Sequence, residues 1–475
     1  MSAQTTEAEY PYIDPLSRID IFPRGLNLGT DTNNNQVTLA GVPLASLTRQ
    51  YGTPLYLIDL GEFTARAQAW AEAMATSFNP ERGLAGGMAY FAGKTLMTAR
   101  LVKIATAAGM GIDSASEGEL RTALAAGADP AHVGLHGNNK SDTEIELALT
   151  GGDLAKTGIG RLIVDSLAEI ERIEAAAVRT GTRPGVMVRV TTGVHAGGHD
   201  FIATAHEDQK FGLSLLNGSA LSAVERINSS EHLDFLGLHS HIGSQIYDLG
   251  AFDAALRVMA GFISELRAKA IPVRELDLGG GYPVAYTPND EKAPEPAEIA
   301  SHLAEIVRET IAEPPFVSIE PGRSVIGPAG ITLYRVGTIK NIPLDEGERR
   351  YVSVDGGMSD NIRPALYGSR YCAIALDSQA RHILPVTETD TLPTRVVGKH
   401  CESGDIIISD TRLPATLTGG DLLLTPVTGA YGRVMGSNYN MLPTPAVIGV
   451  QDGQIVPLLR GVSVADLLAR DYELN

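Results

Sequence analysis

The alternation of short apolar runs with helical stretches between residues 88 and 320 constrains the fold of this chain most. Eight runs of β-branched and apolar residues recur there, and stretches of helical periodicity lie between them. This βα repetition is typical of a parallel sheet covered by helices, and eight repeats predict a (β/α)8 TIM-like barrel. The predicted strands are Met88–Phe91, Gly111–Ser114, His132–His136, Arg161–Asp165, Gly185–Val190, Leu236–His241, Glu275–Leu278 and Phe316–Glu320. The predicted helices include Glu62–Ser77, Glu117–Ala126, Leu167–Arg179, Phe252–Lys269 and Ile299–Ala312.

Beyond Ser324 the pattern changes to short apolar runs separated by Gly and Pro, which predicts an all-β domain of sandwich or barrel-like form. The Asn35–Ala40 run predicts a strand that joins this β domain. We therefore expect an α/β plus all-β chain, with residues 1–50 joining the β domain, 51–325 forming the barrel and 326–475 forming the C-terminal β domain. Its predicted strands are Ile331–Val336, Tyr351–Val354, Arg395–Val397, Asp405–Ser409 and Leu422–Thr425, and its one predicted helix is Val464–Arg470.

Composition excludes several classes of partner. The net charge of −18 disfavours nucleic acid, which is itself a polyanion. Two cysteines, Cys372 and Cys401, cannot build a disulfide framework, which fits a reducing compartment. No apolar run approaches the length of about 18 residues that a membrane span requires, and Met1 to Pro15 lacks a signal pattern. We expect a cytoplasmic protein that contacts neither membrane nor nucleic acid.

Chemically versatile residues follow the predicted barrel strands, where the active sites of such barrels lie. Lys94 follows the first strand, His239, His241 and Ser244 belong to or follow the sixth, Gly279, Gly280 and Gly281 follow the seventh, and Glu320 and Arg323 follow the eighth. Each alone has a structural explanation, but together on one rim they favour a site. An aldehyde cofactor requires a lysine for its Schiff base, a partner for its pyridine nitrogen and a phosphate cup. Lys94, Glu320 and the glycine triplet match these needs, so we predict pyridoxal 5'-phosphate.

Several motifs in order resemble one known family over nearly the whole chain. Phe91-Ala-Gly-Lys94, the segments 237–245 and 279–281, and Glu320-Pro-Gly-Arg323 resemble the alanine-racemase-fold decarboxylases of ornithine, arginine and diaminopimelate. The segments 355–367, 401–405 and 429–440 resemble the diaminopimelate decarboxylase family in particular. That resemblance implies decarboxylation of meso-2,6-diaminopimelate to L-lysine and CO2, the last step of lysine biosynthesis.

The resemblance also implies a role for each matching residue. Lys94 would hold the cofactor and His241 would stack on its ring, while Ser244, Gly281 and Tyr431 would contact its phosphate. Glu320 would face the pyridine nitrogen. Arg323, Arg363 and Tyr367 would bind the distal carboxylate of the substrate, Glu402 the distal ammonium, and Cys401 would protonate the product. Cys401 and Glu402 would come from the partner subunit of a homodimer with shared active sites.

Alternatives of the same fold are a decarboxylase of ornithine, arginine or carboxynorspermidine, or a racemase. Arg363 beside Glu402 favours diaminopimelate, because only that substrate ends in both a carboxylate and an ammonium. A catalytically inactive regulator that binds a protein partner is a further alternative, but it should lack Lys94 or Cys401. We expect no metal site, since His195, His199 and His206 have no cysteines or paired carboxylates nearby. We predict that Cys372 is a buried core residue. Phe91 and Thr95 depart from residues common in the family.

Overall fold

A computed structural model of the chain describes residues 14–29, 36–194, 210–344, 348–384 and 388–474. The chain divides into two compact units. The first, called the barrel unit, consists of Phe63–Val284 and Ala293–Ile326. The second, called the β unit, consists of Met1–Glu62, Ala285–Lys292 and Gly327–Asn475. No helix in the described ranges combines the length and the apolar character that crossing a membrane demands.

Eight parallel strands close on themselves in the barrel unit. They follow the chain in the order β5 to β9 and then β11 to β13, and the ring closes where β13 pairs with β5. Each of the eight predicted strands is confirmed within a few residues. Their bounds are β5 Gly87–Ala92, β6 Gly111–Ser114, β7 Val133–Leu135, β8 Arg161–Val164, β9 Gly185–Thr191, β11 Asp234–His239, β12 Glu275–Asp277 and β13 Phe316–Ile319, with the short β10 Leu213–Ser214 alongside β9.

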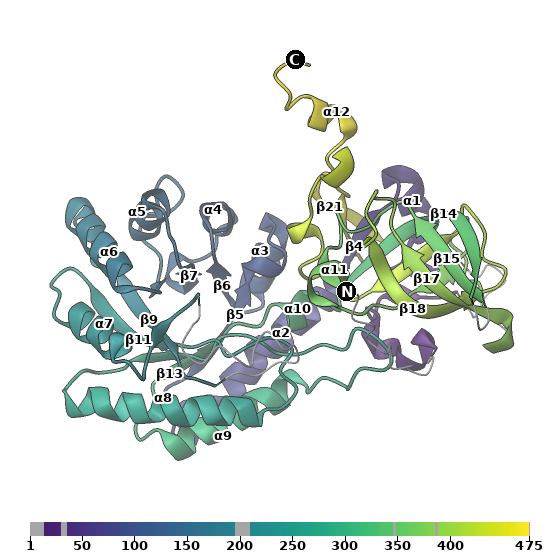
Figure 1. The fold of residues 1–475 in the computed structure, drawn as a ribbon. Coiled ribbons are helices and arrows are strands. Elements are labelled where there is room, and N and C mark those ends of the chain that lie inside the picture. The colour runs from purple at the N-terminus through teal and green to yellow at the C-terminus, as the bar shows by residue number, and fades with distance from the viewer. Residues whose placement is uncertain (1–13, 30–35, 195–209, 345–347, 385–387, 475) are drawn as a thin grey trace. The chain divides into compact units, whose positions relative to one another are not determined.

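Helices cover the outside of this ring (Figure 1). Three of them begin after a serine whose side chain accepts the N–H of a glutamate three residues on: Ser116 from Glu119, Ser141 from Glu144, and Ser166 from Glu169. Such N-caps satisfy otherwise unpaired amides and fix where a helix starts, directly after its strand. The predicted helices are confirmed within three residues at each end. The helices are α2 Leu60–Ser77, α3 Ala99–Ala107, α4 Glu117–Ala125, α5 Asp142–Thr150, α6 Leu167–Thr180, α7 Ser219–Asn228, α8 Gly250–Ala268, α9 Pro296–Thr310 and the short α10 Arg323–Ile326.

The β unit is built on a sheet in the order β18-β17-β15-β14-β4-β20-β21, with β19 pairing both β14 and β16. The five predicted strands all lie within or overlap longer ones, and the predicted helix is α12 Val464–Leu468. Two further helices of this unit, α1 Leu44–Tyr51 and α11 Arg363–Tyr367, were not predicted. The strands are β4 Leu55–Asp59, β14 Gly330–Pro343, β15 Glu348–Val354, β16 Ile374–Leu376, β17 Thr391–Val397, β18 Ile406–Pro414, β19 Leu422–Pro426, β20 Val447–Gln451 and β21 Gln454–Leu459.

The N-terminal part differs from the sequence prediction in two ways. The strand expected at Asn35–Ala40 is β2 Thr38–Leu39, which pairs with β1 Leu26–Asn27 and β3 Val42–Pro43 in a separate three-stranded sheet, and Asn35 lies outside the described residues. The barrel was expected to begin at residue 51, but β4 pairs with β14 and β20. In the structure, the residues up to Glu62 belong to the β unit. The sequence could not show this, because a strand pattern reveals a strand without revealing the strand that pairs with it.

Candidate active site

The structure places the predicted barrel residues at the carboxyl ends of their strands. Lys94 lies in a 3-10 turn, Gly93–Thr95, that directly follows β5, and its side chain is exposed. Glu320 directly follows β13, and the glycine triplet begins two residues after β12. His241 and Ser244 follow β11, and the Ser244 hydroxyl accepts a hydrogen bond of 2.9 Å from Arg323. The predicted rim therefore exists within one compact unit.

Glycine is required at each position of the triplet. A Cβ on Gly279 or Gly281 would lie 2.6 Å from the Ser240 carbonyl or 2.7 Å from the Gly243 carbonyl, and both residues have positive φ, +68° and +110°. A Cβ on Gly280 would lie 2.6 Å from the Glu320 carbonyl oxygen. The loops after β11, β12 and β13 thus approach one another more closely than any side chain would allow.

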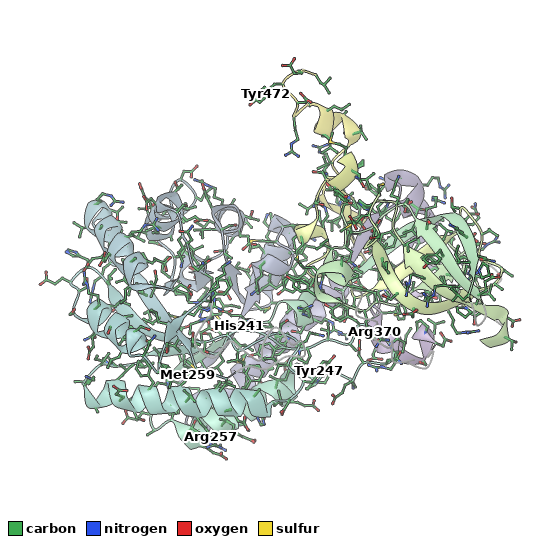
Figure 2. All side chains as sticks on the ribbon, viewed as in Figure 1. His241, Tyr247, Arg257, Met259, Arg370 and Tyr472 are labelled. Atoms are coloured by element: carbon green, nitrogen blue, oxygen red, sulfur yellow. The ribbon has the colours of Figure 1, made fainter. Side chains whose placement is uncertain are left out.

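The His241 ring is held against this loop. Its Nδ1 accepts a hydrogen bond of 3.1 Å from the Gly280 N–H, so that nitrogen carries no proton. Burial, followed by the nearby Lys94 cation, keeps the pKa of His241 well below its ordinary value. His241, labelled in Figure 2, is therefore a neutral ring of fixed orientation, which suits contact with a flat aromatic ligand. A small cleft adjoins it, lined by Arg189, Val190, Thr191, Thr192, Val194, Phe211, Ser240 and His241.

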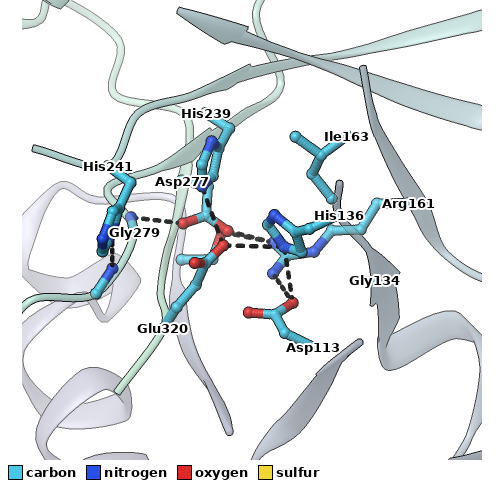
Figure 3. A network of polar contacts seen from close by, with 12 residues as sticks. Asp113, Gly134, His136, Arg161, Ile163, His239, His241, Asp277, Gly279 and Glu320 are labelled. Atoms are coloured by element: carbon cyan, nitrogen blue, oxygen red, sulfur yellow. Dashed lines mark hydrogen bonds and ion pairs between the residues drawn. The ribbon is translucent and has the colours of Figure 1, made fainter. Parts of the chain in front are cut away.

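Glu320 is a buried carboxylate between two imidazoles. Its Oε1 lies 3.1 Å from Nε2 of His136 and 3.1 Å from Nε2 of His239 (Figure 3). Burial alone would raise the pKa of Glu320, but His136 and His239, in contact with it, hold it well below its ordinary value. The carboxylate is therefore ionised.

The two histidines themselves differ in charge. Burial opposes protonation of both, yet Glu320 and Asp113 together raise the pKa of His136 to about 9. Burial outweighs Glu320 at His239 and lowers its pKa to about 4. His136 is thus the cationic partner of Glu320 and His239 the neutral one. Sequence reasoning left His239 between a core and a site role and missed His136, whose only signal was its place at the end of a predicted strand.

A second charged cluster fills the barrel interior. Arg161, 2% exposed, lies 2.8 Å from Asp277 and 3.1 Å from Asp113 (Figure 3). It also lies 2.7 Å from Glu275. The Tyr90 ring lies against its guanidinium, 3.5 Å from the ring centroid. Asp277 also accepts the N–H of Gly279 at 2.8 Å, which connects this cluster to the glycine loop. These charges were also not predicted as site residues.

The β unit holds the other predicted residues. Arg363, on α11, is 5% exposed and donates to the Tyr286 hydroxyl at 2.6 Å and to Ser369 Oγ at 3.1 Å. Within the described part of the chain, no carboxylate pairs with this guanidinium. A buried cation with neutral partners only is suited to bind an anion. Tyr367, on the same helix, is 49% exposed.

Cys401 and Glu402 lie on an exposed loop before β18. The Cys401 N–H donates to Asn440 Oδ1 at 3.0 Å, and its thiol is free. The loop is shaped by the buried Asp405, whose carboxylate contacts the His400 ring at 2.7 Å.

Tyr431 lies within 5.9 Å of Arg363, measured from guanidinium carbon to ring centroid. Cys372 is buried, as predicted.

The two departures from the family pattern can be located in the structure, whereas the histidines of the metal prediction cannot. Phe91 packs edge-on against Phe63, with ring centroids 5.3 Å apart, and the Thr95 hydroxyl donates to the Ala92 carbonyl at 2.8 Å. His195, His199 and His206 lie outside the described residues. Potential ligand atoms of His136, His239 and Glu320 lie within 4.8 Å of one another.

A closed barrel with a lysine, a fixed imidazole, a glycine loop and a buried carboxylate at its rim fits the class of pyridoxal-dependent enzymes, which includes decarboxylases and racemases. The family model "Pyridoxal-dependent decarboxylase, pyridoxal binding domain" matches residues 60–327. The chain is 42% identical over 443 residues to the diaminopimelate decarboxylase of Mycobacterium tuberculosis, covering 91% of this chain and 94% of that protein. With the Bacillus subtilis enzyme it shares 38% over 450 residues, covering 93% and 97%. The chain belongs to the diaminopimelate decarboxylase family.

Solved structures agree with this assignment. The diaminopimelate decarboxylase of M. jannaschii superposes with a TM-score of 0.83 at 26% identity, covering 94% of this chain and 98% of that chain. The Helicobacter pylori enzyme, solved as a complex with L-lysine, superposes with a TM-score of 0.78 at 28% identity, covering 90% and 99%. The fold prediction, a barrel followed by a β domain, is confirmed.

Proposed function

We propose that this protein is a pyridoxal-phosphate-dependent carboxy-lyase that converts meso-2,6-diaminopimelate to L-lysine and CO2, the last step of lysine biosynthesis. The observation that carries the substrate choice is Arg363, a buried guanidinium whose described partners are neutral hydroxyls and rings. A substrate with a second carboxylate satisfies such a group, whereas ornithine brings only an ammonium.

The residues of the barrel rim fit the cofactor. A buried polar cluster lies there, in which both imidazoles contact Glu320 Oε1 at 3.1 Å and Nδ1 of His239 has no hydrogen-bond partner in the described structure. Buried polar groups are rarely left unsatisfied, so this nitrogen supports the presence of a further polar group beside the cluster. In the glycine loop the N–H groups of Gly279 and Gly280 donate to Asp277 and His241, and the N–H of Gly281 has no such bond among the described residues, which supports its use for a phosphate.

Each rim residue then has a role toward the cofactor. Lys94 attaches it, His241 lies against its ring, and Glu320 pairs with the pyridine nitrogen. The phosphate contacts would come from Gly281, Ser244 and Tyr431. Bound pyridoxal phosphate accepts the electron pair that loss of a carboxylate leaves. Glu320 serves this chemistry because an ionised carboxylate stabilises a protonated pyridine nitrogen.

Further residues bind the substrate and move a proton. Arg363, with Arg323 and Tyr367, would hold the distal carboxylate, and Glu402 the distal ammonium. The Cys401 thiol would donate the proton that replaces the lost carboxylate. We further propose a homodimer in which Cys401 and Glu402 serve the site of the partner chain, so that each site is built from two subunits.

Incubation of the purified protein with pyridoxal phosphate and meso-2,6-diaminopimelate tests this proposal. We expect stoichiometric L-lysine and CO2, with ornithine and arginine turned over far more slowly at equal concentration. Faster turnover of ornithine would instead identify an ornithine decarboxylase, and a racemised product without CO2 would identify a racemase. Absence of reaction with every amino acid, in protein that has bound the cofactor, would favour an inactive regulator.

A further inference from the structure

His136 has no role in the proposed function, yet it contacts the carboxylate that function depends on. It directly follows β7, and its backbone N–H donates a hydrogen bond of 2.8 Å to the Ser114 carbonyl. Its Nε2 lies 3.1 Å from Glu320 Oε1 and 3.3 Å from Asp113 Oδ1 (Figure 3). The ring therefore lies between two carboxylates, with its side chain 13% exposed.

A buried lysine fixes the loop that carries this ring. Lys140, 2% exposed, donates from Nζ to the Gly137 carbonyl at 2.7 Å and to the Ile163 carbonyl at 2.6 Å. It also pairs with Glu169 at 3.1 Å. These contacts connect the residue next to His136 to the end of β8 and to α6, so the position of the ring is determined by buried interactions rather than by a free loop.

The two oxygens of Glu320 have different surroundings. The closest contacts of both imidazoles are with Oε1, which is fully buried, and no hydrogen bond reaches Oε2 from the residues that the structure describes. Of the two rings, His136 also faces a second carboxylate, Asp113, and His239 does not. His136 is thus the ring whose surroundings favour its cationic form, and Oε2 is the oxygen left for a ligand.

We propose that His136 is a positioning residue whose cationic ring holds Glu320 Oε1, so that the carboxylate stays ionised and Oε2 is left for the pyridine nitrogen of the cofactor. A cation in contact with a carboxylate lowers the proton affinity of that carboxylate. A proton shared between Glu320 and the pyridine nitrogen is then favoured on the nitrogen. This inference rests on the proposed function.

The protonation of the cofactor's pyridine nitrogen can be read directly. The variants His136→Leu, His136→Gln and Glu320→Gln are loaded with pyridoxal phosphate labelled with ¹⁵N in the ring, and the ¹⁵N chemical shift is recorded by solid-state NMR. The matched control is His132→Gln, which changes an exposed histidine four residues earlier that lies 3.8 Å from Asp129.

We expect the ¹⁵N shift of His136→Leu to move toward that of an unprotonated pyridine. Turnover should fall about ten- to hundredfold, the size typical of one interaction with a charged group. His136→Gln, which keeps an N–H donor without the charge, should lie between His136→Leu and the unmodified protein. His132→Gln should match the unmodified protein in both measurements.

Three results overturn the inference, and one of them also overturns the role of Glu320. If Glu320→Gln moves the ¹⁵N shift and neither His136 variant does, the inference is wrong while the proposed function stands. If Glu320→Gln also leaves the shift unchanged, Glu320 does not pair with the pyridine. Stoichiometric zinc in the purified protein, lost in His136→Leu, would make His136, His239 and Glu320 a metal site instead. Thermal unfolding of each variant identifies any that fails to fold, and His136→Gln, which retains the ring's polarity, then decides the question.

Discussion

Replacement of Arg161 by Met tests the electrostatics of the barrel interior. The Arg161 guanidinium is surrounded by Asp113, Asp277 and Glu275, at 2.7 to 3.1 Å, and is the cation of that cluster. Methionine fills a similar volume but carries no charge, so the carboxylates then face one another without the guanidinium cation between them. Removal of one partner of a buried ion pair costs about 3–5 kcal/mol in the free energy of unfolding, because the remaining charge stays buried and unpaired.

The expected change is large enough to measure by thermal unfolding. For a unit of about 150–250 residues, 1 kcal/mol shifts the midpoint by about 2–4 °C, so Arg161→Met should unfold about 6–20 °C lower. Scanning calorimetry and far-ultraviolet circular dichroism would follow the transition. The double variant Arg161→Met with Asp113→Asn should recover part of the loss, since it removes one of the unpaired carboxylates.

A surface pair of similar geometry provides the control. Arg172 contacts Asp142 at 2.5 Å, but its side chain is 39% exposed. Exposed pairs contribute only about 0–1 kcal/mol, so Arg172→Met should shift the midpoint by at most about 4 °C. Equal midpoints for the Arg161 and Arg172 variants would refute the argument, because burial would then make no difference to the cost of losing the cation.

Four further predictions follow from the site. Borohydride reduction of the cofactor-loaded protein should label Lys94, and a label on Lys103 would contradict the assignment. Arg363→Ala should raise KM for meso-diaminopimelate about ten- to hundredfold while the cofactor's absorbance persists, and an unchanged KM would exclude its role. A mixture of Lys94→Ala and Cys401→Ala proteins should regain about a quarter of the unmodified activity after random subunit exchange, because each hybrid dimer has one intact site. If each site were built within one chain, no activity would return. Burial opposes protonation of His136, but its two carboxylate neighbours raise its pKa to about 9. The stability that this contact provides is complete below pH 6.5, about the pKa of histidine in the unfolded chain, and is lost as the pH rises through about 9. The urea midpoint of the unmodified protein should therefore fall over that range. In His136→Leu it should fall less.

Much of the barrel could be predicted from local sequence. Each of its strands is a short apolar run, and helix starts such as Ser141 are defined by a serine and a glutamate three residues later. The rim residues Lys94, His241 and Glu320 followed from one rule, because the carboxyl ends of parallel strands share one edge. The cofactor roles of Lys94 and Glu320 followed from the needs of an aldehyde cofactor, the role of His241 came from the family resemblance, and all three roles remain predictions.

Short elements and pairings were harder to predict. The helix α11, five residues long, is too short for a helical period to be recognised, although it carries Arg363. The strand β4 has the same apolar pattern as a barrel strand, so its place beside β14 and β20 could not be known from its own residues. Periodicity reports the local conformation of a segment and the faces that it buries, and pairing depends on what lies opposite.

The sequence by itself determined the order of strands and helices, the residues at the rim and the class of chemistry, because each of these is carried by neighbours along the chain. The tertiary structure alone decided which charges meet. His136 and Glu320 are far apart in the sequence, and they come within 3.1 Å only because the barrel closes between β13 and β5. The charge state of a buried group depends on its neighbours in space and on its loss of water, so the anionic Glu320, the cationic His136 and the carboxylates around Arg161 became visible only in the folded chain.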